Sequence, residues 1–172
     1  MFRQKQLLVA GGMAAAIAVD LIVGLYVQWG APDPLPANAG ERLAFAARWL
    51  LIPGLALFAG VGMTANQRFL KPDAIDGERK VESSAFEINL RYNLNTLEQS
   101  ILAAIAWMGL SLVLPVDELA VIPRLAILFG LGRAAFWLGY LYAPWARAFG
   151  MGLTAYPTFV ALIFLAWRSV TG

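Results

Sequence analysis

The chain of 172 residues contains no cysteine and no histidine, and only 14% of its residues are charged. Without cysteine it forms no disulfide and offers no thiolate as a nucleophile or metal ligand. Without histidine it lacks imidazole, both as an acid–base group and as the commonest protein metal ligand. The net charge of +2 is too small to indicate a nucleic-acid partner, and no basic run supports one.

Apolar side chains dominate instead, at 60% of the residues. A soluble domain has about 25% charged residues, so this composition predicts an integral membrane protein. The first apolar run is too long for a signal-peptide core and no cleavage site follows it, so we expect it to stay as a helix. We predict an all-α bundle of five transmembrane helices, each approaching the roughly 20 residues that cross a bilayer. They are expected at about residues 7–29, 43–64, 96–114, 122–142 and 149–167.

Basic residues predict the orientation, because acids contribute little to it. An N-terminus inside the cell places eight on the cytoplasmic side: Arg3, Lys5, Arg68, Lys71, Arg79, Lys80, Arg91 and Arg147. Three then lie outside: Arg42, Arg124 and Arg168. We therefore expect a cytoplasmic N-terminus and an external C-terminus, with a bacterial inner membrane as the location.

Polar side chains recur at helical spacing at the mouth of the third span. Arg91, Asn95 and Glu98 are separated by four and three residues, which places them on one helix face. Arg133 and Tyr140 follow on the fourth span at a spacing of seven. A charge in the hydrocarbon costs about 2.5–3.5 kcal/mol on insertion scales, so such residues indicate a functional site. The expected orientation brings both stripes to the cytoplasmic face.

These motifs resemble those of the membrane-associated proteins in eicosanoid and glutathione metabolism (MAPEG). The family's Arg-x-x-x-Asn-x-x-Glu motif matches residues 91–98, and its arginine with a tyrosine seven residues later matches Arg133 and Tyr140. A short exit with Ala-Pro and then arginine is similar to residues 143–147. The resemblance covers roughly residues 43–170. It implies a trimeric four-helix domain at 43–172 with a polar cytoplasmic loop at 65–91, preceded by an additional helix and proline-rich loop at 1–42.

The resemblance also implies a function, with glutathione as co-substrate bound between neighbouring subunits. We expect a membrane transferase or peroxidase that acts on lipophilic electrophiles arriving from the bilayer. Arg147 would stabilise the glutathione thiolate, since a nearby cation favours the reactive form, and Tyr140 would assist it. The residues expected to bind glutathione are Arg68, Arg91, Asn95, Glu98, Arg133 and Tyr140. Membrane lipids and further copies of the chain are the other expected partners, and no metal is expected.

Other interpretations of the same residues stay open. Arg68 and Arg147 lie near helix ends, where arginines often snorkel to the headgroups. Arg91, Asn95 and Glu98 suit a structural pair with a cap, and Tyr140 suits an interfacial aromatic belt. Phe136 and Ala148 stand where relatives often carry polar side chains. The alternative function is a non-catalytic membrane protein of the same fold that binds a lipid or partner helix.

Asp20 lies within the first span, among Ala, Ile and Leu residues. It either pairs with Arg48 of the second span or is protonated and bonds a neighbouring helix. We assign it no catalytic role.

Overall fold

A computed structural model describes residues 2–26, 36–70 and 84–172, which form helices and no strand. Five helical segments are long and apolar enough to cross a membrane, as predicted. The polar residues 71–83, Trp29 and most of the proline-rich turn lie outside the described residues. The elements are α1 (Phe2–Tyr26), α2 (Ala39–Trp49), α3 (Leu51–Phe69), α4 (Ser84–Val113), the short 3₁₀ helix η2 (Val116–Glu118), α5 (Val121–Tyr142) and α6 (Arg147–Thr171).

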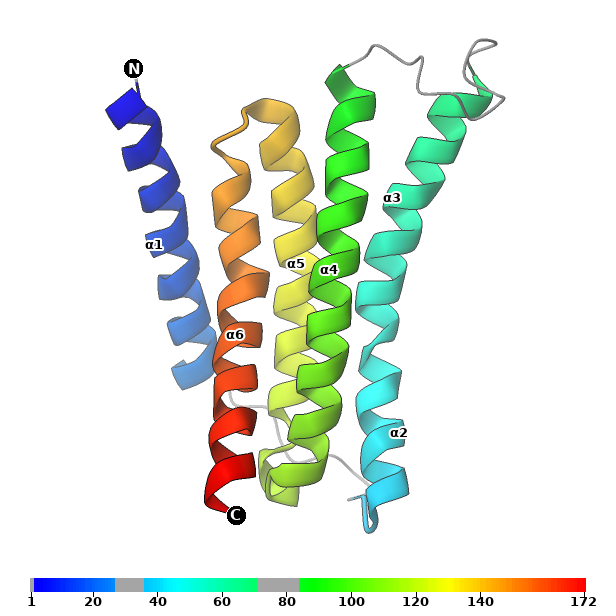
Figure 1. Cartoon of the computed structure of the whole chain (residues 1–172), viewed down its shortest axis with the longest axis vertical. Helices are drawn as coiled ribbons and strands as arrows, with labels where there is room; N and C mark the ends of the chain where they lie inside the picture. Colours follow the sequence, from blue (N-terminus) through cyan, green and yellow to red (C-terminus); the bar gives the residue numbers. More distant parts are fainter. Residues whose placement is uncertain (1, 27–35, 71–83) are drawn as a thin grey trace.

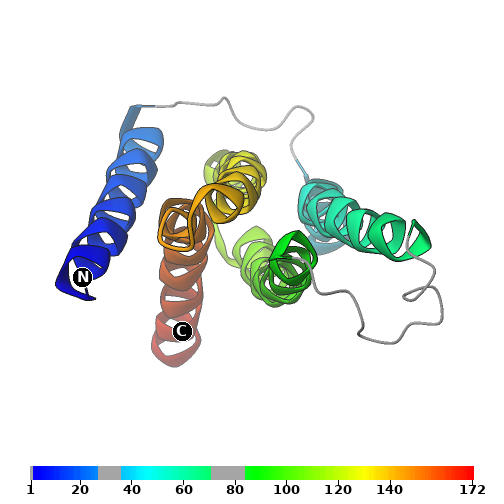
Figure 2. The same ribbon diagram turned by 90° about the horizontal axis from the view of Figure 1, so that it is seen from above.

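The helices run roughly side by side, with the N-terminus at one end of the bundle and the C-terminus at the other (Figure 1). The end that holds the start of α1 also holds the α5–α6 turn; it is called the upper end below. Viewed along the bundle, α1 lies on one side of α6, and α3 lies on the far side of α4 (Figure 2). The helix on which α1 packs is α6, whereas α4 contacts α2, α3, α5 and α6.

The second and third predicted spans differ from the observed helices in continuity and in length. The second span is two helices, α2 and α3, because Pro53 lacks the N–H that would continue the hydrogen-bond ladder. The polar segment predicted at 65–91 is shorter at both ends, since α3 continues to Phe69 and α4 begins at Ser84. A helix satisfies its own backbone and can therefore extend past the hydrocarbon into water. Arg91 consequently lies within α4 rather than in a loop.

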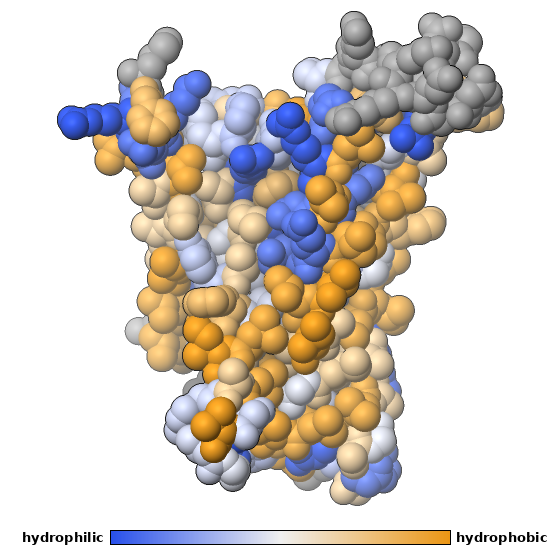
Figure 3. Space-filling model, viewed as in Figure 1, coloured by the Kyte–Doolittle hydropathy of each residue, from blue (hydrophilic) through white to orange (hydrophobic). Residues whose placement is uncertain are grey.

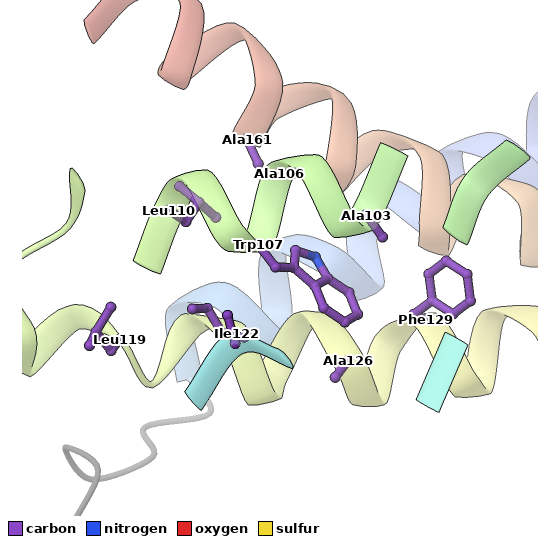
Figure 4. Packing of buried hydrophobic residues seen from close by; sticks show 10 residues of the cluster. Ala103, Ala106, Trp107, Leu110, Leu119, Ile122, Ala126, Phe129 and Ala161 are labelled. Carbon is purple, nitrogen blue, oxygen red and sulfur yellow. The ribbon is translucent and has the colours of Figure 1, made fainter. Parts of the chain in front are cut away.

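The lower half of the bundle holds the main apolar core. Trp107 on α4 is 1% exposed and meets Phe129 of α5 edge to face, with ring centroids 6.1 Å apart. Small side chains surround this indole and let the helices approach it (Figure 4). At the same end, Arg42 donates hydrogen bonds to the carbonyl oxygens of Ser111 and Leu114 at 3.1 and 2.9 Å. These carbonyl groups at the C-terminal end of α4 lack a partner within the helix, and Arg42 supplies one.

The α5 and α6 backbones approach each other closely at Gly150. A Cβ on Gly150 would overlap the backbone of Phe136 and the carbonyl oxygen of Gly132, so only glycine fits there. This contact fixes the height of α6 against α5 and brings the start of α6 beside the end of α5. The side chains of Arg133, Tyr140 and Arg147 are positioned by it.

Asp20 does not pair with Arg48. Both carboxylate oxygens of Asp20 are buried without a hydrogen-bond partner, and Arg48 is exposed on α2. The two residues belong to helices on opposite sides of the bundle (Figure 2). Neither of the bonds expected from the sequence is present in the described part of the chain.

Candidate functional site

Three of the predicted residues meet at the upper end of the bundle. Nη1 of Arg91 donates to the hydroxyl oxygen of Tyr140 at 2.9 Å. The guanidinium carbon of Arg147 lies 4.6 Å from the centroid of the same tyrosine ring, a cation–π contact. Tyr140 itself is 4% exposed. Side chains from α4, α5 and α6 are therefore joined through one tyrosine.

A cavity of about 500 Å³ opens beside this tyrosine. Its polar lining consists of Arg91, Asn95, Tyr140, Arg147 and Tyr156. Apolar side chains line the rest, among them Phe136 of α5 and Met151 of α6. None of the described residues that line the cavity is acidic. On the face shown in Figure 3, the surface over α4 is hydrophilic towards the upper end of the bundle and mostly hydrophobic towards the lower end. The described lining carries two cations and no carboxylate, which suits a negatively charged group, although the charge of Glu87, one turn earlier on α4, also acts on Arg91.

Arg133 lies behind the cavity rather than in its wall, and is 1% exposed. Its Nη1 donates to Oδ1 of Asn95 at 2.6 Å, and its Nη2 donates to Oγ1 of Thr154 at 2.5 Å and to the Gly150 carbonyl oxygen at 3.3 Å. The guanidinium also stands 4.7 Å from the Phe136 ring centroid.

No carboxylate among the described residues is bonded to Arg133, so Arg133 and Glu98 do not pair within one subunit. Neutral oxygens and two aromatic rings hold the cation instead. Phe136, which stands where relatives often carry a polar side chain, supplies one of those rings. The amide oxygen of Asn95 accepts the hydrogen bond from Arg133. Its amide nitrogen therefore remains as a donor for a ligand in the cavity.

The structure does not bring Glu98 or Arg68 to this cavity within one subunit. Glu98 is exposed on α4. Arg68 lies on α3, with its guanidinium 5.6 Å from the Phe86 ring centroid. Because α3 and the α1–α6 pair flank opposite sides of α4, Arg68 is separated from the cavity by that helix (Figure 2).

Sequence reasoning missed several residues of the site. The α6 side chains Met151, Ala155 and Tyr156 line the cavity, and Thr154 binds Arg133. A signal for this face was present, since Gly150, Thr154 and Thr158 recur every fourth residue, a pattern of small and polar residues typical of helix interfaces in membranes. The two cavity residues of α1, Val9 and Met13, carried no signal, because apolar side chains occur all round that helix.

Comparison with known proteins addresses the fold independently of these contacts. The family model of the MAPEG family matches residues 43–171, which is most of the chain. The chain belongs to the MAPEG family. No curated protein and no solved structure matches it. The match covers α2 to α6 and leaves α1 outside, in agreement with an additional N-terminal helix on a MAPEG domain. Membership fits a glutathione-related function in the membrane.

Proposed function

We propose that this MAPEG protein is a glutathione-dependent transferase or peroxidase acting on lipophilic electrophiles. The observation that carries the proposal is the convergence of Arg91 and Arg147 on Tyr140 at the edge of an acid-free cavity. A cavity with this charge suits an anion, and glutathione offers two carboxylates and a thiol that ionises with a pKa of roughly 8.5. The apolar remainder of the lining suits a lipophilic acceptor.

Tyr140 and Arg147 are the proposed catalytic residues. The Tyr140 oxygen accepts a hydrogen bond from Arg91, which leaves the phenolic hydrogen free to be donated to a sulfur. Arg147 adds a positive charge over the same ring, and a nearby cation favours thiolate over thiol. The tyrosine and the two arginines would thus stabilise the nucleophile before the acceptor arrives.

The reaction itself requires no other group. In transfer, the thiol proton goes to solvent, the thiolate sulfur bonds the electrophilic carbon, and the leaving group departs with its electron pair. In peroxide reduction, two glutathione molecules supply two electrons and become the disulfide, while the hydroperoxide becomes an alcohol and water. Ionisation of the thiol precedes both reactions, so both depend on the same residues.

The remaining proposed contacts divide between the cavity and its surroundings. Arg91 would hold a glutathione carboxylate with its planar fork, and Asn95 would donate its amide to a backbone carbonyl. Arg133 would act through Asn95, whose amide it orients. Glu98 would receive the glutathione ammonium, and Arg68 a second carboxylate, across an interface with a neighbouring subunit.

The position of Glu98 supports such an interface. It is exposed on a membrane helix, between Leu94 and Ile101, which are also exposed at 62% and 53%. A carboxylate facing lipid costs about 2.5–3.5 kcal/mol on insertion scales, so a second copy that covers this face would be favoured. We propose a homotrimer, with the cavity at the cytoplasmic end and the C-terminus outside. Light scattering corrected for detergent should give a mass near three subunits; a monomer with intact helicity would contradict this assembly.

Titration calorimetry with glutathione in detergent tests the proposed function. The wild-type protein should bind glutathione, and Glu98→Gln should weaken binding by about ten- to a hundred-fold, the effect of losing a charged hydrogen bond. Glu118→Gln is the matched control, because Glu118 is an exposed acid in η2, at the opposite end of the bundle. No heat with wild-type protein would remove glutathione from the proposal, and equal affinities in all three proteins would remove Glu98.

A second candidate function is supported by Ala148 and Phe136, which line the cavity without offering a hydrogen bond. In that case the protein binds an anionic lipid or a partner helix at the same cavity and performs no chemistry. Glutathione thiolate formation separates the two functions, since a lipid-binding protein has no need to ionise a thiol.

A further inference from the structure

Among the described residues, Asp20 is the acid whose two carboxylate oxygens are both buried without a hydrogen-bond partner. It lies on α1, in a segment long and apolar enough to cross a membrane. The family match begins at residue 43, so it includes neither this helix nor its acid. The function proposed above makes no use of the carboxyl group.

Asp20 lies on the face of α1 that packs against the bundle. Val9, Met13, Ala16, Asp20 and Val23 are separated by four or three residues, which places them on one helix face. The first two line the cavity, Ala16 is fully buried, and Val23 packs against the same apolar cluster as Ala16. The carboxyl group of Asp20 is therefore part of the interface that holds α1 in place.

The part of α6 that faces this carboxyl group carries no charge. The two helices run in the same direction, and a Cβ on Gly152 would lie 2.5 Å from the Cβ of Ala16 (Figure 1). Four residues further along both helices, Asp20 is level with Tyr156, whose side chain is neutral. Arg147 is nine residues before that tyrosine, or about 13 Å along the helix axis.

The other cations of the neighbouring helices are distant or bonded elsewhere. Arg168 is twelve residues beyond the level of the carboxyl group on α6, or about 18 Å. Lys5, the nearer of the two basic residues of α1, is fifteen residues away, or about 22 Å. On α5, Arg124 donates to a carbonyl oxygen of its own helix at 3.2 Å, and Arg133 is bonded within the network described above.

This environment favours the neutral form of the carboxyl group. An ionised carboxylate that is buried without water or a cation is far more costly than the uncharged acid. Asp20 is six residues, or about 9 Å, from Tyr26 at the end of α1, so a helix that leaves α6 can shift until the group reaches headgroup water. The protonated form therefore favours the packed helix, and the charged form favours the separated one.

We propose that Asp20 is a proton-binding site that fastens α1 to α6. The helix is docked while the carboxyl group carries its proton, and it separates when that proton passes to water. The step transfers one proton to solvent and breaks no other covalent bond. Because Val9 and Met13 belong to the docked face, loss of the proton also opens the α1 side of the cavity. The proposal does not depend on glutathione.

Infrared spectroscopy of the full-length protein in lipid vesicles detects the proton directly. A carboxylic-acid C=O band is expected at neutral pH, and it should be absent from Asp20→Asn. Asp117→Asn is the matched control, because Asp117 is an exposed acid in η2, and it should retain the band. The band should disappear as the pH is raised.

Disulfide trapping measures the docking of α1. The chain has no cysteine, so Gly12→Cys with Ala148→Cys introduces a single pair. A Cβ on Gly12 would lie 3.5 Å from the Cβ of Ala148, which is within the range that a disulfide spans. The pair is oxidised over a pH series in three backgrounds: wild type, Asp20→Asn and Asp117→Asn. Thiol reactivity is the same in each, so the initial rate relative to Asp20→Asn reports docking alone.

The relative rate in wild type should be constant at acid pH. It should then fall by up to about tenfold per pH unit once the proton leaves, the dependence of an equilibrium that releases one proton. Asp117→Asn should follow wild type. A difference spectrum between wild type and Asp20→Asn without the carboxylic-acid band would show an ionised Asp20 and overturn the proton site. A relative rate that stays constant over the pH range in which the band disappears would overturn the fastening of α1.

Discussion

The buried guanidinium of Arg133 makes Thr154 the most informative position for a stability measurement. Thr154 Oγ1 accepts the 2.5 Å hydrogen bond from Nη2 of Arg133, and Thr154 is 2% exposed. Thr154→Val keeps the β-branched shape and removes the acceptor. The Nη2 group would then keep only the 3.3 Å contact to the Gly150 carbonyl oxygen. Arg133 already has an unpartnered Nε, so the loss falls on a cation with few remaining partners.

The expected magnitude follows from the charge on the donor. Hydrogen bonds to charged groups contribute about 1.5–3 kcal/mol, whereas side-chain hydrogen bonds between membrane helices average about 0.6 kcal/mol. Thr154→Val should therefore lower the free energy of unfolding by about 1.5–3 kcal/mol. Thr158→Val is the matched control, because its hydroxyl is equally buried but bonds only the Thr154 carbonyl oxygen on its own helix, at 2.8 Å. Its cost should be about 0.6 kcal/mol or less.

Unfolding by increasing mole fractions of sodium dodecyl sulfate, followed by circular dichroism, measures both variants under one condition. The difference between them, rather than either value, reports the charged hydrogen bond. If Thr154→Val costs no more than Thr158→Val, the neutral cage of Arg133 does not stabilise the bundle and the reasoning about its burial is wrong.

Two further changes have defined outcomes. Arg147→Ala should raise the pKa of bound glutathione thiol and lower turnover with a generic aromatic electrophile, with a smaller effect on glutathione affinity. The ultraviolet absorbance of the thiolate, titrated in wild type and variant, reads this directly, and identical curves with identical turnover would remove Arg147 from the mechanism. Gly150→Ala should destabilise the bundle by about 1–3 kcal/mol, the usual cost of overpacking, because its Cβ meets the α5 backbone rather than a movable side chain. Gly62→Ala, where a Cβ meets nothing within 4 Å, is its control in the same unfolding assay and should be neutral or stabilising.

The spans and the polar stripe could be predicted because both depend on local sequence. Twenty apolar residues must form a helix in a bilayer, where the backbone has no water to bond. The spacing of Arg91 and Asn95 places both on one helix face whatever surrounds them, and the structure does place both at the cavity. The convergence of Arg147 on Tyr140 followed from a turn of a few residues between two antiparallel helices.

What could not be predicted depends on contacts between helices. Hydropathy does not indicate which face of α1 meets α6, so Val9 and Met13 gave no indication that they line the cavity. The burial of Arg133 also depended on a distant approach: only the contact at Gly150 brings Thr154 within reach of its guanidinium. A sequence shows that an arginine lies in a span, but its partners are decided by packing.

Asn95 connects the buried network to the cavity. Its amide oxygen is held by Arg133, which in turn is held by α6 through Thr154 and Gly150. Asn95 lines the cavity together with Arg91 and Tyr140, and its amide nitrogen is the donor that does not take part in the bond to Arg133. The contacts that hold the buried guanidinium of Arg133 therefore also orient the side-chain amide of Asn95 in the site. In a cavity lined by four helices, such an anchor gives a bound ligand one rigid reference.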